Sequence, residues 1–257
     1  MSLIKTPDEI EKIRIAGKIL AQTLEKLAAA AQEGMTLKDL DVLAEGLIRK
    51  AGAQPAFLDY QPEGAERPYP ATLCTSLNNI VVHGVPTAQR RLKSGDLLKL
   101  DLGVRHQNYC ADAAVTVGVG IISGAAQRLI KATQSALAQG IKKAVAGNTL
   151  GDVGSAIKKT IEQAGFKVIK GLTGHGVGKE VHEEPSVYND GQPGRGLKLK
   201  AGMVLAIEPM ASLGSDKIKQ LSDDSYATID NSLAAHFEHT IVITHGAAEI
   251  LTLKMRN

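Results

Sequence analysis

The segment GMTLKD at residues 34–39 returns as GNTLGD at residues 147–152, 113 positions further along the chain. Seven residues are identical over the twenty aligned positions 34–53 and 147–166, and both segments include the same Ala-Gly pair near their ends. Each segment has the pattern of a helix that begins after a threonine cap, carries an acid three residues later and stops at glycine. The repeat predicts a chain built by duplication.

Each repeated helix follows a longer helical pattern and precedes apolar strand runs. The first long helix opens with the capping box TPDE at 6–9, and residues 124–146 form its counterpart. Strand patterns follow at 97–104 and 111–119, and again at 203–210 and 237–244. We therefore predict a single catalytic domain, residues 1–257, with two similar α/β (α+β) halves at about 1–120 and 121–257. Their antiparallel strands would pack about a pseudo-twofold axis under a cover of helices.

The composition is typical of a soluble globular protein, with 44% hydrophobic and 22% charged residues. A net charge of +3 is too small to indicate a polyanionic partner, and 3% aromatics without tryptophan do not support a stacking surface for nucleic acid. No apolar run is long enough to span a membrane, and the N-terminus lacks a secretory pattern. The two cysteines lack zinc-like spacing and fit a reducing compartment. These features predict a cytoplasmic protein with no membrane or specific nucleic-acid partner.

Four carboxylates interrupt or flank the apolar strand runs: Asp101 and Asp112 in the first half, Glu208 and Glu238 in the second. An unpaired charge buried there would cost several kcal/mol. If the duplicated strands meet, the four acids repel one another unless cations lie among them. Two divalent ions bridged by carboxylates would remove that repulsion, whereas the alternative is four unrelated acids at strand ends.

The histidines divide into two groups. His175 lies between glycines at 174 and 176, which permit a close backbone approach, and its neutral imidazole would make a fifth ligand. A phosphate-binding loop is excluded because no Ser or Thr follows Lys179. His83 and His182 lie in turns bounded by Gly or Pro, where functional side chains are commonly presented. The remaining histidines are interpreted as structural or solvated: His106, His236, His239 and His245.

Taken together, the motifs resemble those of the type I methionine aminopeptidase family. They are GHG at 174–176 with HEEP at 182–185, IEP at 207–209, EHT at 238–240, and the two aspartates. The resemblance extends from residue 6 to about residue 253 and implies the duplicated pita-bread fold. It also implies metal-dependent removal of the N-terminal methionine from nascent proteins and peptides, with a preference for a small second residue.

The resemblance implies a centre with two divalent metal ions. Asp101 would chelate one ion, Asp112 and Glu238 would bridge both, and His175 and Glu208 would complete the shell of the other. Co, Mn, Fe(II) and Zn all suit four carboxylates and one imidazole, so the sequence leaves the metal open.

The resemblance also implies three catalytic side chains that act on the substrate. His182 would hydrogen-bond the scissile carbonyl, His83 would act at the reacting amide, and Glu208 is a candidate proton acceptor as well as a ligand. The segment 60–70 is longer than the usual family loop, and the tryptophan that often precedes the last glutamate is absent, with Tyr226 as the nearest stand-in. The candidates for the methionine pocket are Phe57, Tyr60, Tyr69, Cys74 and Tyr226.

Two other functions stay open at this point. A proline-specific relative, a prolidase or aminopeptidase P, typically carries a sizeable extra N-terminal domain, whereas this chain starts on the first helix. A non-catalytic member of the fold that binds proteins tends to lose metal ligands, and all five are present here. The family also implies N-termini of nascent chains as partners, with transient proximity to the ribosome, and a monomer.

Overall fold

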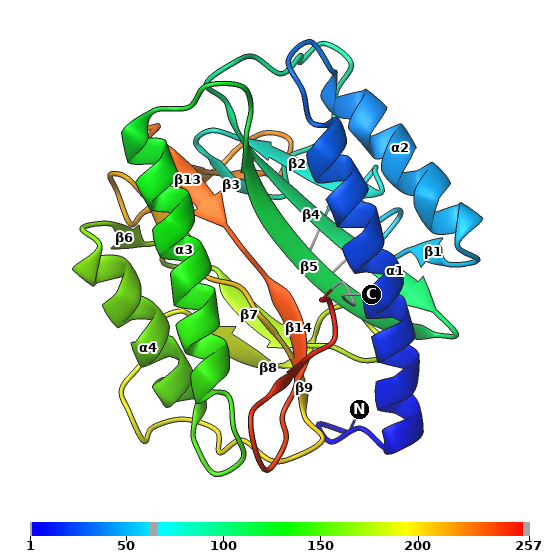
Figure 1. The fold of residues 1–257 in the computed structure, drawn as a ribbon, viewed down its shortest axis with the longest axis vertical. Coiled ribbons are helices and arrows are strands. Elements are labelled where there is room, and N and C mark those ends of the chain that lie inside the picture. The colour runs from blue at the N-terminus through cyan, green and yellow to red at the C-terminus, as the bar shows by residue number, and fades with distance from the viewer. Residues whose placement is uncertain (1, 62–65, 254–257) are drawn as a thin grey trace.

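Two pairs of helices flank a set of antiparallel strands in the computed structural model, which describes residues 2–61 and 66–253 (Figure 1). The first pair is α1 (Pro7–Ala30) and α2 (Leu37–Lys50), and the second is α3 (Gly124–Lys143) and α4 (Leu150–Gln163). The pairs lie on opposite sides of the view in Figure 1, with the strands between them. The predicted duplication of a long helix followed by a short one is confirmed.

The repeated sequence forms the same helix start in both halves. Thr36 and Thr149 cap α2 and α4, and in each case the acid three residues later completes the capping box. The glycines that open the two repeats, Gly34 and Gly147, have φ angles of 88° and 100°, which other residues rarely adopt. The identities that define the repeat are therefore the residues that fix the turn and the first hydrogen bonds of each helix.

The first-half sheet is centred on β4 (Leu97–His106), which pairs with β1 (Gln54–Pro55), β2 (Leu73–Leu77) and β5 (Tyr109–Gly118). β4 and β5 form a hairpin, and both residues of its two-residue loop, Gln107 and Asn108, have positive φ, as a tight hairpin turn requires. Asp101 lies opposite Ala114 and Gly103 lies opposite Asp112. Both aspartates consequently project from the same face of the hairpin.

The second half contains more and shorter strands. A five-stranded sheet has the order β15–β14–β9–β7–β8, and β10 pairs with both β13 and β6. β3 (Ile80–Val82) pairs with β12, whose other neighbour is β11. The bounds are β6 Lys167–Val168, β7 Thr173–Gly176, β8 Glu183–Tyr188, β9 Val204–Ile207, β10 Met210–Ser212, β11 Ile218–Gln220, β12 Tyr226–Thr228, β13 Ala234–His236, β14 His239–Val242 and β15 Glu249–Ile250.

The two glutamates lie at breaks between strands, so the prediction of continuous strands at 203–210 and 237–244 was wrong. Glu208 falls between β9 and β10, where Pro209 has no N–H to contribute to a ladder, and Glu238 falls between β13 and β14. β9 pairs with β14 and β10 pairs with β13, so the two breaks lie opposite each other. The interruption places both glutamates at one point of the second half.

The two halves join along a seam that we define as the contact of β5 with β13 and β14, which run close together through the middle of the molecule (Figure 1). The Thr240 hydroxyl donates to the Asp112 carbonyl at 2.7 Å and accepts from the Asp112 N–H at 2.9 Å. The Thr116 hydroxyl donates to the His236 carbonyl at 2.6 Å and accepts from the His236 N–H at 2.9 Å. Adding 124 to a residue number converts one pair into the other, because residue 112 becomes 236 and residue 116 becomes 240. The seam therefore has local twofold symmetry.

The helices cover two separate apolar cores. Leu20 and Leu27 of α1 belong to one core with Leu98, Leu100 and Leu102 of β4, and α3 and α4 cover the other. Burial of these side chains supplies the main favourable term for holding the strands that carry the acids. Within the described ranges, no helix combines the length and the apolar character needed to cross a membrane.

Candidate metal centre

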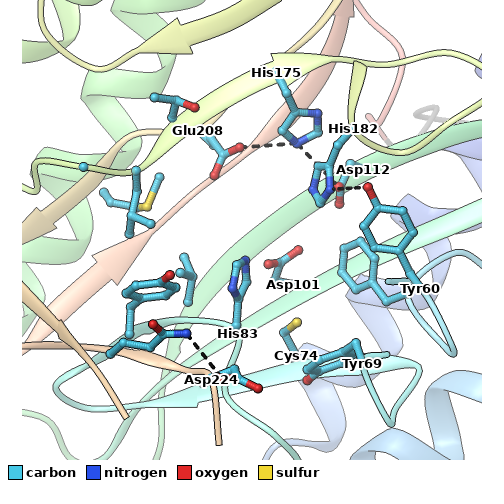
Figure 2. A pocket seen from close by; sticks show the side chains of 18 of the residues that line it. Tyr60, Tyr69, Cys74, His83, Asp101, Asp112, His175, His182, Glu208 and Asp224 are labelled. Carbon is cyan, nitrogen blue, oxygen red and sulfur yellow. Dashed lines mark hydrogen bonds and ion pairs between the residues drawn. The ribbon is translucent and has the colours of Figure 1, made fainter. Parts of the chain in front are cut away.

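The five predicted ligands come from five places in the fold and all line one cavity, in which Figure 2 shows Asp101, Asp112, His175 and Glu208. Their donor atoms form two overlapping groups, in each of which the atoms lie within 4.8 Å of one another: Asp101, Asp112 and Glu238, and His175, Glu208 and Glu238. The His175 Nε2 atom lies 3.4 Å from Glu208 Oε1 and 3.8 Å from Asp112 Oδ2. Glu238 belongs to both groups, which is the position of a bridging ligand.

All four carboxylates are buried, with between 2% and 8% of each residue exposed. Burial raises the pKa of Asp101 and of Glu208 to about 7, because desolvation disfavours the charged form. Burial raises the pKa of Asp112 and Glu238 well above the usual range, and the neighbouring carboxylates add to the effect. In the part of the chain that the structure describes, only histidines form ion pairs with these acids.

The hydrogen-bond status of the acids indicates what the site is built to hold. Asp101 Oδ1, Asp112 Oδ1 and Glu238 Oε1 are buried and have no hydrogen-bond partner among the described residues. Buried oxygens are rarely left unsatisfied, because each loses its hydration without compensation. Carboxylate and imidazole donors suit first-row divalent metals. The residues present therefore fit two divalent cations.

Two glycines allow His175 to reach the acids. A Cβ atom at Gly174 would lie 2.3 Å from the Ala206 carbonyl oxygen, and one at Gly176 would lie 2.1 Å from the Glu184 carbonyl oxygen. Neither position has room for a side chain, so the glycines serve the close approach predicted for them. The His175 Nδ1 atom lies 3.0 Å from the Gly176 carbonyl oxygen. A proton on Nδ1 leaves the Nε2 lone pair free to face the acids.

His83 and His182 project into the same cavity (Figure 2), and a ring nitrogen of His182 lies within 4.8 Å of donor atoms of Asp112 and His175. The His182 ring packs at 90° against that of His175, with centroids 4.4 Å apart, and its Nδ1 lies 3.1 Å from the Tyr60 hydroxyl. The His83 ring packs edge-on against Tyr226 at 5.9 Å. Both imidazoles are exposed to the cavity, yet surrounding protein still lowers their pKa by desolvation, to about 4 for His83 and about 2 for His182. Both rings are therefore neutral at neutral pH.

The five predicted pocket residues all line this cavity of about 1310 Å³: Phe57, Tyr60, Tyr69, Cys74 and Tyr226. The Tyr69 hydroxyl donates to the Gly84 carbonyl at 3.0 Å, and burial raises the pKa of the Cys74 thiol. Residues 62–65 of the long 60–70 segment lie outside the described residues. Arg67, at the far end of that segment, forms an ion pair with Asp224 at 2.9 Å beside the cavity.

His236 was interpreted from the sequence as a structural or solvated histidine, but it lies beside the candidate metal centre. Its Nε2 atom lies 3.3 Å from Glu208 Oε2, and the residue is 1% exposed. The sequence holds one signal for this position, because His236 precedes the ligand Glu238 by two residues. Lys99 is also fully buried, and its Nζ donates to the carbonyls of Asn78 at 2.6 Å and Ala234 at 3.2 Å.

A duplicated α/β scaffold with four buried carboxylates and a histidine at its centre defines a metal-dependent hydrolase. The chain belongs to metallopeptidase family M24, whose model matches residues 11–245. The methionine aminopeptidase of Clostridium acetobutylicum is 46% identical over 254 residues, which are 98% of this chain and 99% of the relative. Methionine aminopeptidase 1 of Bacillus subtilis is 40% identical over 98% of this chain and 99% of its own length.

Solved structures show the same relationship. The crystal structure of a methionine aminopeptidase from Thermotoga maritima matches with a TM-score of 0.93 and 41% identity, covering 98% of this chain and 99% of that one. The prolidase from Pyrococcus furiosus matches with a TM-score of 0.79 and 26% identity, covering 99% of this chain and 66% of that one. The pita-bread fold is thus confirmed, and the prolidase has additional chain beyond the shared part.

Proposed function

We propose that this protein is a methionyl aminopeptidase that removes the N-terminal methionine from proteins and peptides and prefers a small second residue. The observation that carries the proposal is a complete set of five ligands, four buried carboxylates and His175, in a chain that matches methionine aminopeptidases over nearly its full length. Asp101 would hold one divalent ion, His175 and Glu208 would hold the other, and Asp112 and Glu238 would bridge both. Two such ions polarise a carbonyl and lower the pKa of a bound water to near neutral pH.

His182 has the geometry of a donor to the scissile carbonyl. Its Nδ1 atom faces the Tyr60 hydroxyl at 3.1 Å, and the ring is neutral because its pKa is about 2. If Tyr60 donates its proton to Nδ1, the remaining ring proton is on Nε2. An Nε2–H that points into the cavity can stabilise the oxyanion that develops on the carbonyl oxygen.

Glu208 and His83 provide for proton transfer. Glu208 lies beside His175 at the centre, where its carboxylate can accept a proton from water. His83 reaches the cavity from a turn where its φ is 60°, and its pKa of about 4 keeps the ring neutral. A neutral imidazole can accept or donate a proton at the nitrogen of the reacting amide. Phe57, Tyr69 and Cys74 offer an apolar and aromatic surface suited to a thioether side chain.

The wider assignment belongs to the same proposal. The substrates would be N-termini of nascent chains, met by a monomer in the cytoplasm with transient proximity to the ribosome. Residues 1–257 would form one catalytic domain of two halves, about 1–120 and 121–257.

Peptide turnover with defined metals tests the proposal. Protein stripped with a chelator is reloaded with Co, Mn, Fe(II) or Zn in turn and offered Met-Ala-Ser and Ala-Pro peptides. We expect release of methionine from the first peptide and little turnover of the second. Turnover confined to the Ala-Pro peptide would indicate a proline-specific enzyme, and no turnover of either peptide with any metal would indicate a binding protein.

A further inference from the structure

His236 is buried against the metal centre without belonging to its ligands. Its Nε2 atom lies 3.3 Å from Glu208 Oε2, whereas the other carboxylate oxygen, Oε1, lies 3.4 Å from His175 Nε2. The residue is 1% exposed, and neither ring nitrogen has a hydrogen-bond partner of good geometry among the described residues. A buried imidazole is costly unless its polar atoms find partners, and Glu208 is the acceptor within reach.

The backbone around His236 is held in place from the other half of the molecule. Its N–H and C=O both bond the Thr116 hydroxyl, at 2.9 and 2.6 Å. Two residues earlier, the Ala234 carbonyl accepts from Lys99 Nζ at 3.2 Å. Strand β13 is therefore fixed to β4 and β5 on both sides of the point where the imidazole projects. A ring mounted in this way can impose an orientation on a flexible neighbour.

We propose that His236 is a positioning residue for Glu208. In this role its Nε2–H, with Nε2 3.3 Å from Glu208 Oε2, turns toward that oxygen and holds the carboxylate so that Oε1 faces His175 and the metal site. A glutamate side chain has several accessible rotamers, and Glu208 sits at a strand break, so the ladder alone does not hold its carboxylate. The effect on turnover rests on the proposed function, but the effect on metal binding does not.

Three substitutions separate the hydrogen bond from the shape of the ring. His236→Leu removes the donor, His236→Gln retains an amide N–H that can reach Glu208, and His236→Asn carries the same amide on a shorter side chain. His239→Leu is the matched control, because that ring lies in the next strand and contacts Thr252 Oγ1 at 2.8 Å. Binding of Co²⁺ and Mn²⁺ to metal-free protein is measured by calorimetry, together with the visible spectrum of the Co²⁺ form, kcat and KM. Unfolding temperatures of all metal-free variants are recorded.

We expect His236→Leu and His236→Asn to weaken metal binding by about 10- to 100-fold, the usual effect of losing a partner that orients a ligand. The Co²⁺ spectrum should change and kcat should fall by a similar factor, whereas KM for a methionyl peptide should change little. His236→Gln should stay close to the unchanged protein, as should His239→Leu. Should His236→Leu fail to fold, the Gln and Asn variants still decide the question.

Two results would overturn the inference: metal binding by His236→Leu or His236→Asn that equals that of the unchanged protein, or equal impairment of His236→Gln and His236→Asn. The second result would mean that only the ring's shape matters. If the unchanged protein bound metal but released no methionine, the proposed function would fail while the metal titrations still tested His236.

Discussion

Loading the metal centre should release at least about one proton at pH 7. The pKa of Asp101 and of Glu208 is about 7 in the metal-free protein, so each carboxyl is about half protonated at that pH. Burial and the neighbouring acids also raise the pKa of Asp112 and of Glu238, which favours release of further protons. A carboxylate must be ionised to bind a metal, and occupation of both positions therefore displaces these protons.

Calorimetry measures this number directly. Mn²⁺ is titrated into chelator-stripped protein at pH 7 in buffers of different ionisation enthalpy, and the slope of observed against buffer enthalpy gives the protons released. The slope should be larger near pH 5.5 and smaller above pH 8, and the overall affinity for the pair of ions should rise by roughly tenfold or more per pH unit near pH 7. A slope below one at pH 7 would show that the acids are already ionised, and the argument from burial would be refuted.

The same shifts fix the sign of the pH dependence of stability. A carboxyl whose pKa rises on folding keeps its proton where the unfolded chain has lost it, so unfolding is increasingly favoured as the pH rises from about 4 to 7. For Asp101, a change from 3.8 to about 7 corresponds to about 4 kcal/mol. The free energy of unfolding of metal-free protein should therefore fall across this range. Protein reloaded with metal should show a smaller fall between pH 6 and 7, where binding persists, and equal slopes would contradict the reasoning.

Three substitutions test other parts of the site. His182→Ala should lower kcat by about 100- to 1000-fold through loss of an oxyanion donor and leave metal occupancy intact, so unchanged turnover would refute its role. Gly174→Ala should unfold the metal site, because its Cβ would lie 2.3 Å from the Ala206 carbonyl oxygen. Gly46→Ala, on the open face of α2, should instead stabilise the protein by about 1 kcal/mol. Denaturant unfolding of the two variants measures the difference. Thr240→Val should lower the free energy of unfolding by about 1–3 kcal/mol and weaken metal binding, because it leaves the Asp112 N–H and C=O unpaired. Thr240→Ser should restore both hydrogen bonds. A Val variant as stable as the Ser variant would contradict the contribution of these seam hydrogen bonds to stability.

The parts of the fold that sequence could predict depend on neighbours in the chain. A capping box involves residues three apart, and the positive φ of Gly34 and Gly147 is a property of glycine itself, so the repeat reports the helix starts in both halves. The hairpin that brings Asp101 near Asp112 is also local, since a two-residue turn joins its strands. The sequence also indicated that the acids in the strand runs need a cation, because a buried acid requires a partner wherever it lies in the fold.

The parts that could not be predicted depend on partners far away in the chain. Alternation of side chains gave no sign that the strands stop at Glu208 and Glu238, because the breaks are set by pairing of β9 with β14 and of β10 with β13. Lys99 lies two residues before Asp101 in β4, but its burial depends on the carbonyl of Ala234, 135 residues later. His236 lies beside Glu208, which is 28 residues earlier in the chain, and its one local signal, a position two residues before Glu238, does not indicate that contact.

The symmetry of the seam explains why the two halves cannot carry their shared acids at equivalent positions. Along β5, residues 112, 114 and 116 lie opposite residues 240, 238 and 236, with Glu238 N–H donating to Ala114 O at 2.9 Å between the two threonine pairs. The equivalent of Asp112 is position 236, which is four strand residues away along the seam, about 13 Å at 3.3 Å per residue. Two carboxylates at that separation could not share an ion. Position 238 lies opposite Ala114, only two strand residues, about 7 Å, from Asp112 along the seam. The small side chain of Ala114 leaves room for a glutamate there. Departure from sequence symmetry therefore brings Asp112 and Glu238 together, with donor atoms within 4.8 Å of each other, and it leaves position 236 to a histidine whose Nε2 lies 3.3 Å from Glu208 Oε2.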